Sequence, residues 1–191
     1  MSVVELQIAG FGGQGVVLAG MTIGRGLVLY DNYHVSLTQS FGPEARGSAC
    51  SVQLMISSDP VMYPYVQQPG MLVAMSQEAF RKFSPHLRDG GLLLVEEDLV
   101  GPLVRDDVAL ARRVRVHTVP ATRLAEELGR RLVLNMVMVG FFTAITGLLA
   151  PDLARRAVRE LVPQGTEALN LAAFEKGFAA GMVQMVQPAG V

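Results

Sequence analysis

Residues 10–15 read Gly-Phe-Gly-Gly-Gln-Gly, and this glycine loop decides the fold of the chain. It follows an apolar stretch, residues 3–9, and precedes a second apolar stretch that begins at Val16. A strand, a glycine turn and a helix in this order are typical of the first unit of an α/β fold. The free N–H groups and positive end of such a helix point back at the loop, so the pattern predicts an anion cradle. The alternative is that the glycines only permit a tight turn and close packing of helix on strand.

The loop also fits the dinucleotide-binding pattern G-x-G-x-x-G, whose glycines here are Gly10, Gly12 and Gly15. In that class of site an acidic residue at the end of the second strand binds the ribose hydroxyl. The second strand is predicted at residues 33–37, and residues 38–40 after it read Thr-Gln-Ser. Asp31 precedes this strand and therefore lies at its wrong end. A free-standing nucleotide-dependent oxidoreductase is therefore disfavoured.

A second loop is predicted at residues 38–47, of which residues 39–47 read Gln-Ser-Phe-Gly-Pro-Glu-Ala-Arg-Gly. Consecutive strand-end loops of a parallel α/β sheet lie on the same edge, where ligands bind. The two loops together therefore predict one anion-binding site, to which Arg46 adds a cation. Its residues are Gly10, Gly12, Gly13, Gln14, Gly15, Gln39, Gly42, Glu44, Arg46 and Gly47. An ion pair between Glu44 and Arg46 that merely holds the turn is an equally open alternative.

The composition suits one domain with a sizeable core. The chain has 191 residues, of which 50% are hydrophobic and 17% charged, against roughly 25% charged in an average protein. This apolar surplus predicts surface covered by a partner, and a homodimer when the chain is made alone. The alternative is a buried parallel sheet whose strands are apolar on both faces. The formal net charge of −1 gives no sign of a nucleic-acid binder.

The residues that usually hold metals or clusters are few. The single cysteine, Cys50, excludes an intrachain disulfide and a multi-thiolate iron–sulfur or zinc site. We expect it to be a small apolar residue in a strand. The three histidines are far apart in sequence, so no metal site is expected. The first residues do not have the pattern of a secretory signal, and a cytoplasmic protein is expected.

Residues 132–150 form a stretch of 19 residues without a charge, long enough for a membrane helix. The stretch contains Asn135, Thr143 and Gly140, and two arginines precede it. These residues favour a buried helix at an interface over a membrane span. Asn135 is expected to hold a loop backbone in the core rather than to touch a ligand.

Periodicity and turn residues give the remaining organisation. Strands are predicted at residues 3–9, 33–37, 48–56, 71–74, 92–95 and 115–119. Helices are predicted at residues 16–29, 77–83, 132–149, 153–161 and 166–185, and a further helix opens at Thr122. The fold class predicted is a three-layer α/β/α domain with a mostly parallel or mixed sheet. Residues 1–191 form a single domain in this interpretation, with an α/β core in residues 1–120 and a helical portion, residues 121–191, packed on it.

Three segments together resemble a known family. They are residues 8–17, residues 39–47, and Pro120 with the Asn135-Met136 pair. The chain resembles, over nearly its whole length, the gamma subunit of 2-oxoacid:ferredoxin oxidoreductases, a family that includes the pyruvate, 2-oxoglutarate and 2-ketoisovalerate enzymes. The Gly-Gly-Gln-Gly loop and the Gly-Pro-Glu-x-Arg-Gly loop at this separation are a specific combination. Family members often have a second glycine where this chain has Ser48.

The resemblance implies a complex that decarboxylates a 2-oxoacid, here expected to be 2-oxoglutarate, to an acyl-coenzyme A and reduces ferredoxin. Thiamine diphosphate, magnesium and iron–sulfur clusters belong to partner subunits, and this chain alone binds none of them. Coenzyme A carries phosphates, so a contact between it and the two loops is expected. A subunit of an indolepyruvate or aryl-glyoxylate oxidoreductase remains an open alternative.

Overall fold

A computed structural model describes residues 3–42, 49–61 and 63–186. In this part of the chain one mixed sheet has the strand order β2-β3-β1-β4-β5-β6. Strands β1, β4, β5 and β6 run parallel, whereas β3 lies antiparallel between β1 and β2. The strands are β1 (Val4–Phe11), β2 (His34–Phe41), β3 (Ala49–Ser57), β4 (Met71–Ala74), β5 (Leu92–Glu96) and β6 (Arg115–Val119).

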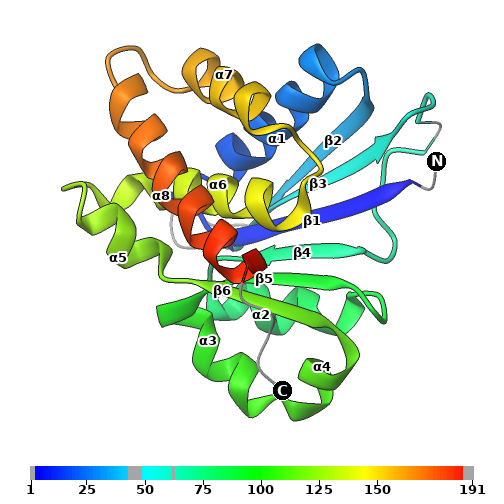
Figure 1. The fold of residues 1–191 in the computed structure, drawn as a ribbon. Helices are drawn as coiled ribbons and strands as arrows, with labels where there is room; N and C mark the ends of the chain where they lie inside the picture. Colours follow the sequence, from blue (N-terminus) through cyan, green and yellow to red (C-terminus); the bar gives the residue numbers. More distant parts are fainter. Residues whose placement is uncertain (1–2, 43–48, 62, 187–191) are drawn as a thin grey trace.

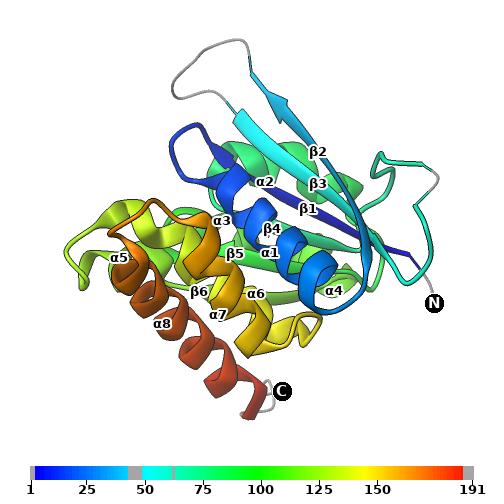
Figure 2. The ribbon, with the colours of Figure 1, turned by 90° about the horizontal axis from the view of Figure 1, so that it is seen from above.

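Helices cover both faces of this sheet, which confirms the predicted three-layer α/β/α class. Figure 1 shows α1, α6, α7 and α8 on one face and α2, α3 and α4 on the other; Figure 2 gives the view from above. The helices are α1 (Val16–Tyr30), α2 (Gln77–Phe83), α3 (Glu97–Asp106), α4 (Val108–Arg113), α5 (Ala121–Glu126), α6 (Leu134–Thr146), α7 (Pro151–Leu161) and α8 (Glu167–Val186). Two short 3-10 helices span Ser84–His86 and Arg131–Val133.

Each face of the sheet has its own hydrophobic core. On the α1 face, residues of β1 and β3 pack with residues of α1, α6 and α8, among them Ile8, Val52 and Phe174. On the opposite face, β4 and β5 pack with α2, α3 and α4. Strands β4 and β5 therefore bury both faces, which explains why they are uninterrupted apolar runs in the sequence.

Strand β2 is longer than the sequence predicted. Residues 38–41, expected in a loop, continue the strand and pair with β3 up to Phe41 opposite Cys50. The predicted end of the strand at residue 37 is wrong, because Thr38, Gln39 and Ser40 are polar and resemble loop residues. On an edge strand, polar residues are accommodated because one side of the strand faces water.

The uncharged helix is shorter than the predicted range, residues 132–149, and it is buried within the fold. Its α-helical part, α6, has thirteen residues, and all from Leu134 to Thr143 are buried. The cover comes from the chain's own helices, chiefly α8, so the expected placement at an interface is wrong. Among the described residues, no helix combines the length and the apolar character needed to cross a membrane. A homodimer therefore has to use another surface.

Two glycines bring α6 and α8 unusually close together. A Cβ atom added at Gly140 would overlap the carbonyl oxygen of Phe174, and one added at Gly177 would overlap the carbonyl oxygen of Val137. Only glycine has room at such a backbone-to-backbone contact. The two helices therefore fix each other's position in the core.

Helices α3 and α4 were not predicted. Gly101 and Pro102 interrupt the helical pattern of α3, and Asp107 separates the two helices. The caps are nevertheless regular: Glu96 Oε2 accepts from Leu99 N at 2.7 Å, and Asp107 Oδ1 accepts from Leu110 N at 3.0 Å. Such side-chain caps satisfy the free N–H groups of short helices.

Candidate functional site

The glycine loop joins the end of β1 to the start of α1, as the sequence predicted. Gly13 has a φ of 96° and Gly15, the N-cap of α1, has a φ of 72°. Both are in the left-handed region that glycine adopts without steric cost. The loop therefore turns tightly enough to direct the start of α1 back towards the end of β1.

Gln14 fastens the loop to the neighbouring strand. Phe11 N donates to Gln14 Oε1 at 2.6 Å, and Gln14 Nε2 donates to the carbonyl oxygen of Met75, just beyond β4, at 3.0 Å. A Cβ atom at Gly10 would lie 2.5 Å from Gln14 Oε1, so this arrangement requires glycine at position 10. Gly10 and Gln14, both predicted as binding residues, thus have roles within the protein itself.

Asn135 holds the other end of the loop. Its Nδ2 donates to the carbonyl oxygen of Gly15 at 3.3 Å, from the first turn of α6. A side chain on residue 15 would collide with the Asn135 amide. The prediction that Asn135 supports a loop backbone in the core is confirmed.

The open side of the loop has the groups that an anion needs. Gly12 and Gly13 are exposed. The first N–H groups of α1, on Val16, Val17 and Leu18, have no backbone acceptor within the described ranges. Such groups, together with the positive end of a helix, attract an anion. The loop therefore presents hydrogen-bond donors to a ligand while Gln14 and Asn135 hold it in place.

A pocket of about 240 Å³ lies beside the start of α1. It contains an arginine, Arg130, which stands just before the 3-10 helix that leads into α6. Sequence reasoning noted Arg130 only as a flank of the apolar segment and missed it as a site residue. The pocket is lined by Gly13, Gly15, Leu18, Arg130, Leu132, Val133, Asn135, Pro163, Thr166, Leu169 and Asn170.

The second predicted loop begins at the same edge of the sheet. Strands β1 and β2 run in the same direction because each is antiparallel to β3, and Gly10 and Phe41 both lie opposite Cys50. The loop closes a hairpin, with Gly42 N donating to Ala49 O at 2.9 Å, rather than leading into a helix. Gln39 is exposed on β2. Glu44, Arg46 and Gly47 lie outside the described residues.

Cys50 lies in β3 directly opposite Gly10 and is a buried free thiol, as predicted. Burial raises the pKa of the Cys50 thiol above its ordinary value, so the neutral form is favoured. In the described part of the chain, no group of three or more His, Cys, Asp or Glu side chains is placed to hold a metal ion.

Comparisons with known proteins agree with this arrangement. Residues 5–180 match the family model described as pyruvate ferredoxin/flavodoxin oxidoreductase. The chain is 46% identical over 174 residues to the 2-oxoglutarate synthase subunit KorC of Methanothermobacter thermautotrophicus, covering 91% of this chain and 92% of that subunit.

Two solved structures have the same fold. The first is a keto/oxoacid ferredoxin oxidoreductase gamma subunit from Geobacter sulfurreducens, with a TM-score of 0.81, 31% identity and coverage of 96% of this chain and 98% of that one. The second is the 2-oxoglutarate:ferredoxin oxidoreductase of Magnetococcus marinus, solved with 2-oxoglutarate, coenzyme A and succinyl-CoA. It has a TM-score of 0.83 at 18% identity, over 96% of this chain and 32% of that one. The chain therefore belongs to the pyruvate ferredoxin/flavodoxin oxidoreductase family, as a gamma subunit of the 2-oxoacid:ferredoxin oxidoreductases.

Proposed function

We propose that the 2-oxoacid is 2-oxoglutarate and that this subunit helps to bind coenzyme A in the complex. The substrate rests on the 46% identity to a 2-oxoglutarate synthase subunit. The thiamine diphosphate, magnesium and iron–sulfur clusters belong to partner subunits, which pass electrons to ferredoxin. A protein with one cysteine cannot ligate a cluster with four thiolates of its own.

The observation that carries the coenzyme A contact is the pocket at the start of α1. It combines the glycine loop and Leu18, at the N-terminal turn of α1, with the Arg130 side chain. Backbone N–H groups and a guanidinium are the donors that proteins use for phosphate. A pocket of about 240 Å³ has room for a phosphate group and the atoms next to it, but not for the whole coenzyme A molecule. This chain would therefore orient one end of coenzyme A, while the reacting thiol lies in a partner subunit.

The test compares Arg130→Ala with Arg131→Ala in the reconstituted complex. Arg131 is the adjacent arginine, also exposed, but it does not line the pocket. A charge-assisted contact to phosphate contributes about 1.5–3 kcal/mol, so Arg130→Ala should raise the KM for coenzyme A roughly tenfold or more. The KM for 2-oxoglutarate and assembly by size-exclusion chromatography should stay near the wild-type values. If both substitutions changed the KM for coenzyme A equally, the proposed contact between Arg130 and coenzyme A would be refuted.

The role as a non-catalytic subunit has its own test. The purified chain alone should reduce no dye with any 2-oxoacid, and addition of the thiamine-binding and cluster-bearing subunits should restore activity. A substrate panel of 2-oxoglutarate, indolepyruvate and aryl glyoxylates, assayed on the full complex, then decides the substrate. Turnover by the chain alone would contradict the subunit role. We also propose a cytoplasmic location and self-association of the isolated chain, and a surface for the latter is argued next.

A further inference from the structure

Strand β2 forms one edge of the sheet, and half of its backbone groups point outward. The bond from Gly42 N to Ala49 O makes residues 42 and 49 a hydrogen-bonded pair of the antiparallel ladder. Such pairs alternate along the strands. The even-numbered residues of β2 therefore bond to β3. The N–H and C=O groups that face away from the sheet belong to Val35, Leu37, Gln39 and Phe41.

This edge lacks the usual protection against pairing with another strand. Edge strands of soluble proteins are commonly blunted by Lys, other charged side chains, Pro or a bulge. Residues 34–41 read His-Val-Ser-Leu-Thr-Gln-Ser-Phe, without Asp, Glu, Lys, Arg or Pro, and their register with β3 is unbroken. An eight-residue edge of this kind is a template for another strand.

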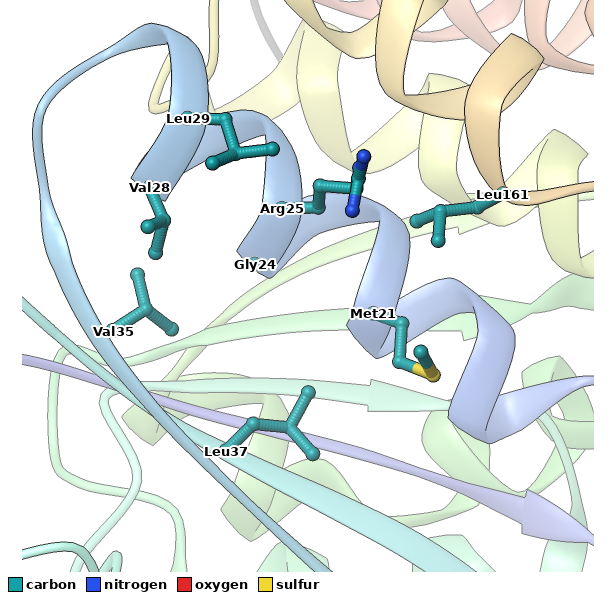
Figure 3. Close-up of a pocket in the computed structure, with 8 residues that line it drawn as sticks. All are labelled: Met21, Gly24, Arg25, Val28, Leu29, Val35, Leu37 and Leu161. Atoms are coloured by element: carbon teal, nitrogen blue, oxygen red, sulfur yellow. The ribbon is translucent and has the colours of Figure 1, made fainter.

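An apolar pocket lies directly beside the edge. Figure 3 shows Val35 and Leu37 pointing from β2 towards α1, where Met21, Val28 and Leu29 complete the apolar wall. The pocket measures about 320 Å³, and its lining is completed by Gly24, Arg25 and Leu161. Phe41 lies on the same face of β2 by strand alternation and is 65% exposed. One strand therefore carries both an exposed aromatic ring and an apolar pocket.

We propose that the occupant of this surface is a second copy of the chain, with the two β2 strands paired antiparallel about a twofold axis at Thr38. Odd-numbered residues carry the outward groups, so they have to pair with odd-numbered residues. An axis at Thr38 sets Val35 opposite Phe41 of the other copy, and Leu37 opposite Gln39. Each Phe41 ring then meets the partner's pocket, and the same contact forms twice, as a closed twofold dimer requires.

The contact area is sufficient for a dimer. Eight residues at about 3.4 Å each make an edge about 27 Å long. A sheet layer is about 10 Å thick, because stacked sheets pack about 10 Å apart, and a helix with its side chains is about 10 Å wide. The sheet together with the layer of α1 is therefore about 20 Å deep. The interface then buries about 500 Å² on each copy. That total, about 1,000 Å², is the lower bound for a specific interface.

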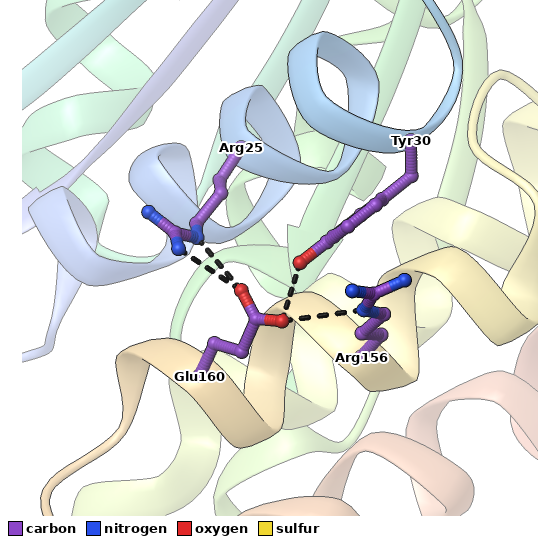
Figure 4. A network of polar contacts seen from close by, with 4 residues as sticks. All are labelled: Arg25, Tyr30, Arg156 and Glu160. Atoms are coloured by element: carbon purple, nitrogen blue, oxygen red, sulfur yellow. Dashed lines mark hydrogen bonds and ion pairs between the residues drawn. The ribbon is translucent and has the colours of Figure 1, made fainter.

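The charges beside the pocket do not oppose this contact. Arg25 is bound to Glu160, with Nε and Nη2 at 3.1 and 3.0 Å from Oε2. The other oxygen of Glu160 accepts from Tyr30 at 2.5 Å and from Arg156 at 3.2 Å (Figure 4). The hydrogen bond from Tyr30, and then that from Arg25, lowers the pKa of Glu160. Arg25 therefore lies at the interface paired with the Glu160 carboxylate. The Arg25 side chains of the two copies thus do not face each other as unpaired charges.

The first test measures self-association of the isolated chain by light scattering and sedimentation. Wild type should be a dimer. Phe41→Lys should raise the dimer dissociation constant roughly a hundredfold, because two ring contacts are lost in each dimer. Tyr65→Lys is the matched control, since Tyr65 is 55% exposed but lies outside the surface, and it should leave the constant unchanged. A monomeric wild type at about 100 μM, or equal effects of the two substitutions, would overturn the proposal.

The second test reads the register directly. Thr38→Cys sets the new thiol opposite its own copy at a non-hydrogen-bonded pair, where Cα atoms are about 4.5 Å apart and a disulfide can form. Mild oxidation should cross-link this variant but not Ser36→Cys, because Ser36 lies opposite Ser40 of the partner. Cys50 is buried and should not interfere. Cross-linking of Ser36→Cys but not Thr38→Cys, or of neither variant, would exclude the twofold axis at Thr38.

Discussion

The close contact between α6 and α8 makes a sharp prediction about two glycine-to-alanine changes of very different size. At Gly177, a Cβ atom would overlap the carbonyl oxygen of Val137, a backbone atom that cannot rotate away. At Gly101 in α3, the new Cβ would lie 3.5 Å from Arg105 Nη1 and 3.7 Å from Glu97 Cγ, both ordinary contacts. Both glycines are inside helices, but Gly101 directly precedes Pro102. A Cβ atom before proline disfavours the helical conformation, which offsets the gain that alanine brings at Gly101.

The magnitudes follow from these distances. Alanine stabilises a helix interior by about 0.5–1 kcal/mol relative to glycine. Overpacking a core costs about 1–3 kcal/mol, and the upper end applies where the obstacle is backbone. Gly177→Ala also forces α6 and α8 apart by about an ångström, which weakens the dispersion contacts along both helices. We expect a net loss of about 2–3 kcal/mol for Gly177→Ala and a change of no more than about 0.5 kcal/mol for Gly101→Ala, where the gain and the penalty before Pro102 offset each other.

Differential scanning calorimetry of the isolated chain measures both effects. In a protein of this size, 1 kcal/mol shifts Tm by about 2–4 °C. The Tm of Gly177→Ala should fall by about 4–12 °C, and that of Gly101→Ala should change by no more than about 2 °C. Gly140→Ala, which meets the Phe174 carbonyl from the other helix, should behave like Gly177→Ala. A Tm for Gly177→Ala within 1 °C of wild type would refute the backbone contact between α6 and α8.

Three further predictions concern ligands, pH and cooperativity. NAD and NADP should bind no tighter than roughly 1 mM, because the end of β2, residues 39–41, reads Gln-Ser-Phe and has no ribose-binding acid; a micromolar dissociation constant by calorimetry would revive the dehydrogenase interpretation. Hydrogen bonds from Arg155 lower the pKa of Glu175 below its ordinary value of 4.5, so their stabilisation is present above that pH and lost as the pH falls through the lower folded value. The Tm difference between wild type and Glu175→Gln should therefore be largest near neutral pH and shrink as the pH falls below 4.5, and a constant difference would contradict this linkage. Residues 1–120 and 121–191 should unfold in one calorimetric transition, because both contribute to the core on the α1 face; two separate transitions would show two domains.

The parts of the site that could be predicted from sequence are those with local signals. The glycine loop is recognisable because turns with a positive φ need glycine at specific positions, and Gly13 and Gly15 occupy them. Asn135 could be assigned to a loop backbone because a lone amide in an uncharged helix needs a partner. Its partner, Gly15, lies 120 residues away in sequence. Only the packing of α6 on α1 identifies it.

The failures also have local causes. The sequence predicts too early an end for β2 because Thr38, Gln39 and Ser40 are polar residues typical of loops, although Val35, Leu37 and Phe41 alternate as in a strand. Arg130 was missed because its approach to the glycine loop depends on the turn between α5 and α6, which no periodicity encodes. The structural role of Gln14 was not predicted, because its bond partner Met75 lies 61 residues away in the sequence.

The position of α8 has a consequence for how the chain is made. Residues 134–146 leave the ribosome before residues 167–186, yet the outward side of α6 is covered only when α8 packs on it. During this interval an uncharged thirteen-residue helix exposes apolar surface, the condition under which nascent chains aggregate or engage chaperones. A chain cut short before α8 therefore keeps this apolar surface of α6 exposed. Helix α8 is thus the element that ends the exposure of α6 during synthesis.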